Sequence, residues 1–185
     1  RVLFRSIQPA IDACIQIHRE HRPDPRRIRA VNLQVAPIVF ELCMKKDLKV
    51  GLEGKFSIYH AAAIGLVRGR ASLDEFTDEA VADPDLRRVR ECTVPHRNAQ
   101  IADDAVHVEV TLDDGSVITK RVDHAVGNIE KPMSDTDIED KFRDLAGRVI
   151  GSERAERMIR GCRTLEELPD CRQWIAFAVP DGYSR

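Results

Sequence analysis

Residues 106–123 read VHVEVTLDDGSVITKRVD, and this stretch decides the β part of the fold. From 106 to 112, valines alternate with mostly polar residues, which is the period of two expected of a strand with one buried face. The segment DDGS at 113–116 holds residues that favour tight turns, and 117–123 returns as a partner strand. We therefore predict an antiparallel β-hairpin in which the two aspartates serve the turn rather than catalysis.

Helices and one further strand are predicted before the hairpin. Residues 9–20 repeat apolar side chains at helical spacing, and this helix must end before Pro23. The apolar run 28–35 predicts a strand, and the alanine-rich segment 61–67 predicts a closely packed helix that ends at Gly69. Shorter helices are predicted at 38–48, at 72–80 and from 83 onward, and a loop at 51–54.

Only helices are predicted after a break at 127–132. They are expected at 134–150, 152–160 and 164–178. Strands mixed with helices, followed by helices alone, predict an α+β fold. We expect residues 1–127 to form an α+β domain, and residues 128–185 to form helices that pack on a further structure outside these residues.

The composition argues against several classes of protein. The 185 residues carry a net charge of −2, with no basic stripe for nucleic acid and no apolar run that would span a membrane. Five scattered cysteines without a CxxC pair predict reduced thiols in a cytoplasmic protein. The dispersed histidines predict no metal site, and His96, His107 and His124 show no partner pattern. The arginines from 87 to 97 are predicted to form a solvated face.

Three short segments carry a further pattern. They are QPAIDA at 8–13, GKFS at 54–57 followed by FTDE at 76–79, and KPMS at 131–134. In this order and spacing, with the hairpin before the last, they resemble the MmgE/PrpD family across nearly the whole chain.

The resemblance implies a two-domain enzyme without metal or cofactor, in which a small α+β lid covers the active-site cleft of a larger all-helical domain. Family members include 2-methylcitrate dehydratase, cis-aconitate decarboxylase and iminodisuccinate epimerase, which act beside the carboxylates of small di- and tricarboxylic acids. We expect the C-terminal part of such a lyase, nearest a dehydratase, with decarboxylation and epimerisation left open. The resemblance also implies a homodimer, and an N-terminal helical domain outside these residues.

Lys55 is the leading candidate for the site. It matches the lysine of the family's KFS segment and follows a glycine that lets a ligand approach the backbone. An ammonium at a helix start forms a receptor for a carboxylate, whereas a merely structural lysine there would oppose the helix dipole. We expect Lys55 to bind substrate and to take part in catalysis.

Three neighbours of Lys55 each have two interpretations. Ser57 either caps the following helix or contacts substrate. His60 either transfers protons or makes a structural hydrogen bond. Tyr59 either packs or donates its hydroxyl to substrate.

Two further candidates lie near the N-terminus. Gln8 stands where many family members have histidine, so it can hydrogen-bond a carboxylate but cannot shuttle a proton. Arg5 is a candidate for a bidentate carboxylate clamp. The departure at Gln8 keeps a second class open, a non-catalytic module that binds a carboxylate or a protein.

Overall fold

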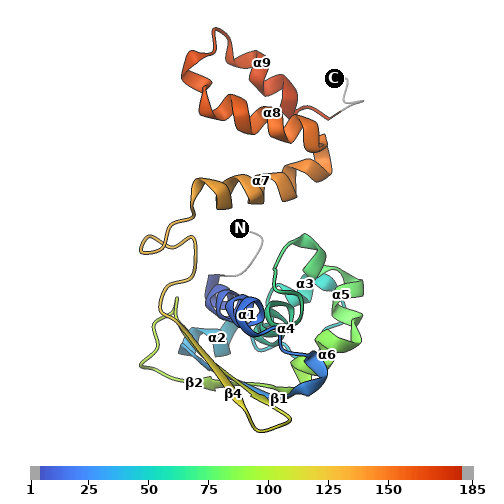
Figure 1. Cartoon of the computed structure of the whole chain (residues 1–185), viewed down its shortest axis with the longest axis vertical. Coiled ribbons are helices and arrows are strands. Elements are labelled where there is room, and N and C mark those ends of the chain that lie inside the picture. The colour runs from blue at the N-terminus through green and yellow to red at the C-terminus, as the bar shows by residue number, and fades with distance from the viewer. Residues whose placement is uncertain (1–4, 181–185) are drawn as a thin grey trace. The chain divides into compact units, whose positions relative to one another are not determined.

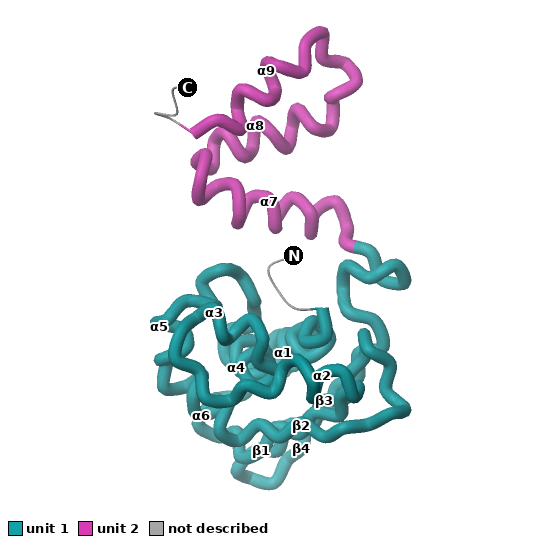
Figure 2. Tube along the Cα trace, turned by 180° about the vertical axis from the view of Figure 1, so that it is seen from behind, with its two compact units in different colours: residues 1–132 teal, residues 133–185 magenta. Residues whose placement is uncertain are grey.

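The computed structural model describes residues 5–180 (Figure 1). It divides the chain into two compact units, residues 1–132 and residues 133–185, which we call unit 1 and unit 2 (Figure 2). Unit 1 combines helices with a sheet, and unit 2 contains only helices in its described part. The α+β prediction is confirmed.

The sheet of unit 1 has four strands in the order β2-β1-β3-β4. The strands are β1 (Ile28–Val35), β2 (Thr93–Arg97), β3 (Val106–Leu112) and β4 (Val117–Val122). β1 runs parallel to β2 and antiparallel to β3, and β3 pairs with β4 in the predicted hairpin. Arg27 anchors the turn, because its guanidinium donates to Asp113 at 2.9 Å and to Asp114 at 2.6 Å. The turn role of the two aspartates is confirmed.

Long helices cover one face of this sheet (Figure 1). They are α1 (Gln8–His21), α4 (Ile58–Arg68) and α6 (Pro84–Cys92). The valines of β3 at 106, 108 and 110 point into the core with Val31 and Leu33 of β1, all at most 1% exposed. Alternate residues of β3, such as His107 and Glu109, remain partly exposed, as the period of two predicts.

Small residues let α1 and α4 pack closely in the same direction. A Cβ on Gly65 would lie only 2.5 Å from the Cβ of Cys14, and one on Gly69 would meet the ring of His18. The His18 ring also bonds the carbonyl of Leu66 through Nδ1 at 2.7 Å. Residue numbers rise together along both helices, so their N-termini lie at the same end of the pair.

Several short elements differ from the predictions. Unit 1 also contains η1 (Arg5–Ile7), η2 (Pro25–Arg27), α2 (Pro37–Leu42), α3 (Gly51–Gly54), η3 (Leu73–Phe76) and α5 (Asp78–Ala82). The helix predicted at 38–48 stops at Leu42, and the loop predicted at 51–54 is a helical turn. The helix predicted at 72–80 breaks at Thr77, because its hydroxyl accepts from the Ala80 N–H and caps a new helix.

Unit 2 consists of α7 (Asp135–Ile150), α8 (Ser152–Arg163), η4 (Leu165–Glu167), α9 (Cys171–Ile175) and η5 (Ala176–Ala178). Ser134 and Asp137 cap α7 reciprocally, at the start of the helix predicted at 134–150. The predicted helix 164–178 is instead a series of short helical segments.

Unit 2 also contains an apolar hollow of about 370 Å³, lined by residues that include Ile138, Phe142, Met158 and Trp174. Over residues 5–180, no helix is both long and apolar enough to cross a membrane.

Candidate functional site

The shared end of α1 and α4 gathers most of the predicted site residues. Gln8 is the first residue of α1, and Ser57 is the N-cap of α4. Gly65 lies beside Cys14, and Gly69 lies beside His18, so each residue of α4 pairs with a residue of α1 at a constant difference in number. Extended toward the N-termini, the same pairing places Gln8 level with Tyr59. Two helix N-termini, each carrying partial positive charge, therefore lie side by side.

Lys55 sits at the C-cap of α3, two residues before the cap of α4. It is half-buried, and its N–H donates to the Leu52 carbonyl at 3.2 Å. Within the described part of the chain, no carboxylate lies within ion-pair distance of its ammonium. Lys45, Lys120 and Lys131 each form an ion pair, whereas Lys49 and Lys141, like Lys55, form none within residues 5–180. Among these lysines without an ion pair, Lys55 is the one that lies beside the N-cap of α4.

Ser57 is fully buried and serves the helix. Its Oγ accepts from the His60 N–H at 3.2 Å, and its carbonyl accepts from the Ala61 N–H at 3.0 Å. The adjacent Ile58 N–H donates to the Cys43 carbonyl, which ties the start of α4 to the end of α2. This geometry supports the capping interpretation of Ser57.

His60 lies in the interior with no exposed surface. Its Nε2 is 2.7 Å from the Glu75 carbonyl, and its Nδ1 is 3.3 Å from Nη1 of Arg90. A carbonyl only accepts and a guanidinium only donates, so the ring is neutral with its proton on Nε2. Burial lowers the pKa of His60 to about 4. These contacts favour the structural interpretation of His60 over proton transfer.

Tyr59 and Gln8 flank the same helix ends. Tyr59 is 8% exposed, burial raises its pKa, and the ammonium of Lys46 lies 5.2 Å from its ring centroid. Gln8 is half-buried, and the N-cap of α1, Ile7, has no side-chain capping bond among the described residues. Packing thus explains Tyr59, and Gln8 lies at the N-terminal end of α1 with part of its side chain exposed.

Arg5 lies among acidic side chains. It is exposed in η1 and lines a hollow of about 430 Å³ together with Asp103, Asp104 and Glu130. Carboxylates around a guanidinium compete with a carboxylate ligand, so this environment argues against Arg5 as a substrate clamp.

A buried charged group beside His60 was not predicted. Arg90 is 5% exposed and donates through Nη2 to the Val81 carbonyl at 2.7 Å, which corrects its assignment to a solvated face. Glu75 is fully buried, and Ser72 and Arg70 donate to its carboxylate. Burial raises the pKa of Glu75, but hydrogen bonds from Ser72 and Arg70 outweigh it and hold the pKa below its usual value. Ser72 and Glu75 form a local capping box at the start of η3, a contact that their spacing of three residues favours. The local sequence pattern gives no signal for the contacts of Arg90 with Val81 and His60, because these residues lie on other helices.

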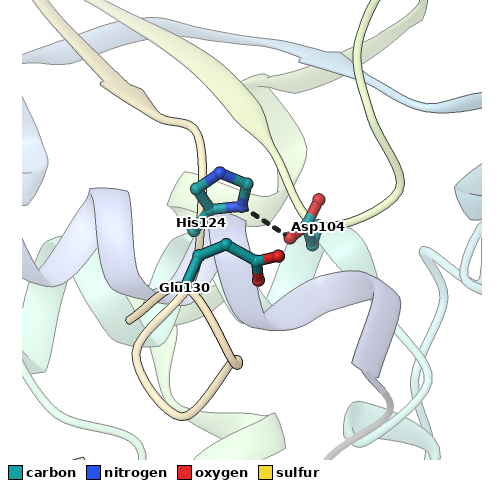
Figure 3. A group of neighbouring side chains, drawn as sticks. All are labelled: Asp104, His124 and Glu130. Atoms are coloured by element: carbon teal, nitrogen blue, oxygen red, sulfur yellow. Dashed lines mark hydrogen bonds and ion pairs between the residues drawn. The ribbon is translucent and has the colours of Figure 1, made fainter. Parts of the chain in front are cut away.

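His124 has a partner that the sequence pattern missed. Its Nδ1 lies 2.8 Å from Oδ2 of Asp104 (Figure 3). That oxygen also accepts a hydrogen bond from the side-chain amide of Asn128. With Glu130, these residues bring one ligand atom each to within 4.8 Å of one another, the spacing a metal ion requires. Because Asp104 already bonds His124 and Asn128, the group joins the segment before β3 to the segment after β4.

The His124–Asp104 pair predicts a pH-dependent contribution to stability. The Asp104 carboxylate raises the pKa of His124 above 6.5, and the imidazole lowers the pKa of Asp104 below 3.8. The contribution of His124 is therefore fully present below pH 6.5 and is lost as the pH rises through its raised pKa. We expect His124→Gln to lower the urea midpoint more at about pH 5.5 than at about pH 8.5. Equal losses at both values would show that the pair is not charged in the folded protein.

The fold and the site define an α+β domain that brings two helix N-termini and a free lysine to one end. The chain belongs to the MmgE/PrpD family, because residues 4–167 match the model of the MmgE/PrpD C-terminal domain. It is similar to human (Homo sapiens) cis-aconitate decarboxylase, with 29% identity over 123 residues, which are 64% of this chain and 26% of that protein. It is also similar to the mouse (Mus musculus) protein of that name, with 28% identity over 64% of this chain and 25% of that protein. The chain thus spans about a quarter of the length of these relatives.

Proposed function

We propose that this chain is part of a lyase that acts next to a carboxylate of a small di- or tricarboxylic acid. The observation that carries the proposal is the ammonium of Lys55, which forms no ion pair with residues 5–180, at the shared N-terminal end of α1 and α4. A lysine and two helix N-termini together attract an anion more strongly than either alone. Family membership supports the same assignment.

In the proposed reaction, a proton leaves the carbon next to the bound carboxylate, and negative charge builds on that carboxylate. Lys55 stabilises this charge, so its contact strengthens in the transition state. The hydroxyl group on the neighbouring carbon then takes up a proton from the protonated general base and leaves as water, while a carbon–carbon double bond forms, as in a 2-methylcitrate dehydratase-like elimination. The second candidate is loss of carbon dioxide, which the names of the two relatives favour.

Gln8 constrains how protons move. An amide can hold a substrate hydroxyl or carboxylate but cannot accept a proton at neutral pH. We therefore assign the general base to the part of the polypeptide outside these residues. Unit 1 acts as a lid that brings Lys55 to the substrate and keeps water out.

Unit 2 has a structural role in this proposal. Ile138 and Val149 of α7 are 53% and 67% exposed, and the hollow beside α7 and α8 is mainly apolar. Apolar surface of this kind requires a partner in water. We propose that these helices pack on the helical domain of the same polypeptide.

The proposal predicts the effect of Lys55→Ala in the full polypeptide. With cis-aconitate or 2-methylcitrate as substrate, kcat/KM should fall by about tenfold to a hundredfold, because a hydrogen bond to a charged group contributes about 1.5–3 kcal/mol. The unfolding temperature should stay close to that of the wild type, since Lys55 has no ion-pair partner within residues 5–180.

Lys49→Ala is the matched control, because it removes an exposed lysine from the segment before α3. It should leave kcat/KM unchanged. Wild-type kcat/KM in Lys55→Ala would remove Lys55 from the mechanism. Tight binding of the acid by the wild type without any turnover would instead favour the non-catalytic module that Gln8 keeps open.

A further inference from the structure

We infer that His60 is a positioning residue, whose buried ring fixes the turn that presents Lys55. The inference rests on the proposed function of Lys55 and gives His60 a role without substrate contact. It starts from the space next to Gly54, the residue immediately before Lys55. A Cβ on Gly54 would lie 2.8 Å from Cδ2 and 3.2 Å from Nε2 of His60. The ring therefore packs directly against the backbone of Gly54.

The His60 ring cannot easily move away from Gly54. Its two nitrogens bond the Glu75 carbonyl and Arg90, and its edge packs on the Phe76 ring with centroids 5.7 Å apart. Arg90 is held in turn by the Val81 carbonyl at 2.7 Å. Residues of η3 and α6 thus contact the imidazole directly, and α5 holds the arginine that contacts it.

The short helix α3 is held at both ends. At its start, the Gly51 N–H donates to Oδ1 of Asp78 at 2.6 Å, and a Cβ on Gly51 would collide with the backbone of Phe76. At its end, Gly54 rests on the His60 ring. Because Lys55 follows directly, these two supports determine where its side chain begins. Removing the His60 ring removes the contact that holds Gly54, so the turn that contains Lys55 can adopt several conformations.

A double-mutant cycle in the full polypeptide tests the inference. With cis-aconitate as the probe, His60→Ala should lower kcat/KM about tenfold in the wild-type background. It should cause no further loss in a Lys55→Ala background, because His60 acts through Lys55. Equal losses in both backgrounds would overturn the inference.

Leu86→Ala controls for lost stability. Leu86 is a fully buried residue of α6, so its truncation also weakens the core of unit 1. It should leave kcat/KM near the wild-type value. A tenfold loss in Leu86→Ala would show that general destabilisation explains the effect of His60→Ala.

Hydrogen exchange decides the inference independently of turnover. Amides 54–57 should exchange faster in His60→Ala than in wild type, and at the wild-type rate in Leu86→Ala. Unchanged exchange in His60→Ala would overturn the positioning role even if the protein has no activity on cis-aconitate. If amides 54–57 exchange faster in His60→Ala while Lys55→Ala keeps wild-type kcat/KM, His60 supports the Lys55 turn but the proposed function of Lys55 is rejected.

If His60→Ala does not fold, Gly54→Ala replaces it in these experiments with the same expected outcomes, because the added Cβ displaces the His60 ring.

Discussion

Gly65→Ala is expected to lower the free energy of unfolding of unit 1 by about 2–3 kcal/mol. The added Cβ would lie 2.5 Å from the Cβ of Cys14 and 3.2 Å from the Ile11 carbonyl oxygen. Both atoms belong to the well-packed helix α1, so the helices must separate. This loss outweighs the gain of up to about 1 kcal/mol that alanine brings to a helix interior. Urea unfolding measures the difference.

Gly147→Ala is the matched control for Gly65→Ala. Gly147 lies inside α7, and a Cβ there would meet nothing within 4 Å. Only the helix propensity changes, so this variant should be more stable by roughly 0.5–1 kcal/mol. A Gly65→Ala variant as stable as the wild type would contradict the close, parallel packing of α1 and α4. The common end of these helices, and with it the site, depends on that packing.

Unit 1 is expected to lose about 3 kcal/mol of stability between pH 6.5 and pH 4 because of His60 alone. Burial lowers the pKa of His60 to about 4 in the folded protein, whereas the unfolded chain binds the proton near pH 6.5. In this window the unfolded state carries more protons, so stability falls as the pH falls. Above about pH 7.5 the His60 ring is neutral in both states and its contribution is constant.

His60→Gln isolates this titration, because glutamine keeps a donor but does not ionise in this range. We expect the variant to be less stable than the wild type at pH 7 and the difference to narrow steadily toward pH 4. The measurement is the free energy of urea unfolding of both proteins at several pH values. If the free energies of unfolding of the wild type and His60→Gln depend on pH in the same way, the His60 ring is already charged, or accessible to water, in the folded protein.

The elements that local patterns determine were predictable from the sequence. The hairpin of β3 and β4 follows from alternating valines around DDGS, and its pairing matches the prediction. The helix predicted at 9–20 is α1, and Gly69 ends α4 with φ of 62°, a left-handed conformation that favours glycine. In these cases the residues that decide the structure lie within one turn or one strand of each other.

The strand β2 and the burial of Arg90 depend on distant contacts and were not predicted. β2 contains Pro95 and Arg97 and resembles a polar segment, but it pairs in parallel with β1, some sixty residues away. Proline is tolerated there because β2 is an edge strand. Arg90 is buried because the Val81 carbonyl satisfies it from another helix. The types and spacing of residues in the sequence do not predict such contacts.

The candidate site was predictable in part. The segment GKFS, at the junction of a glycine turn and a helix start, pointed to Lys55, and the structure leaves that lysine unpaired within residues 5–180. The common end of α1 and α4 depends on how Gly65 meets Cys14, which no local pattern shows. The sequence left proton transfer and a structural hydrogen bond open for His60, and the structure buries this residue in the core.

A structure of the full polypeptide with cis-aconitate bound tests the central claim most directly. The measured quantity is the distance from Nζ of Lys55 to the nearest carboxylate oxygen of the ligand. We predict about 2.7–3.0 Å, with the ligand at the N-terminal end of α1 and α4. An ammonium directed into bulk solvent, with the ligand bound elsewhere, would contradict the account.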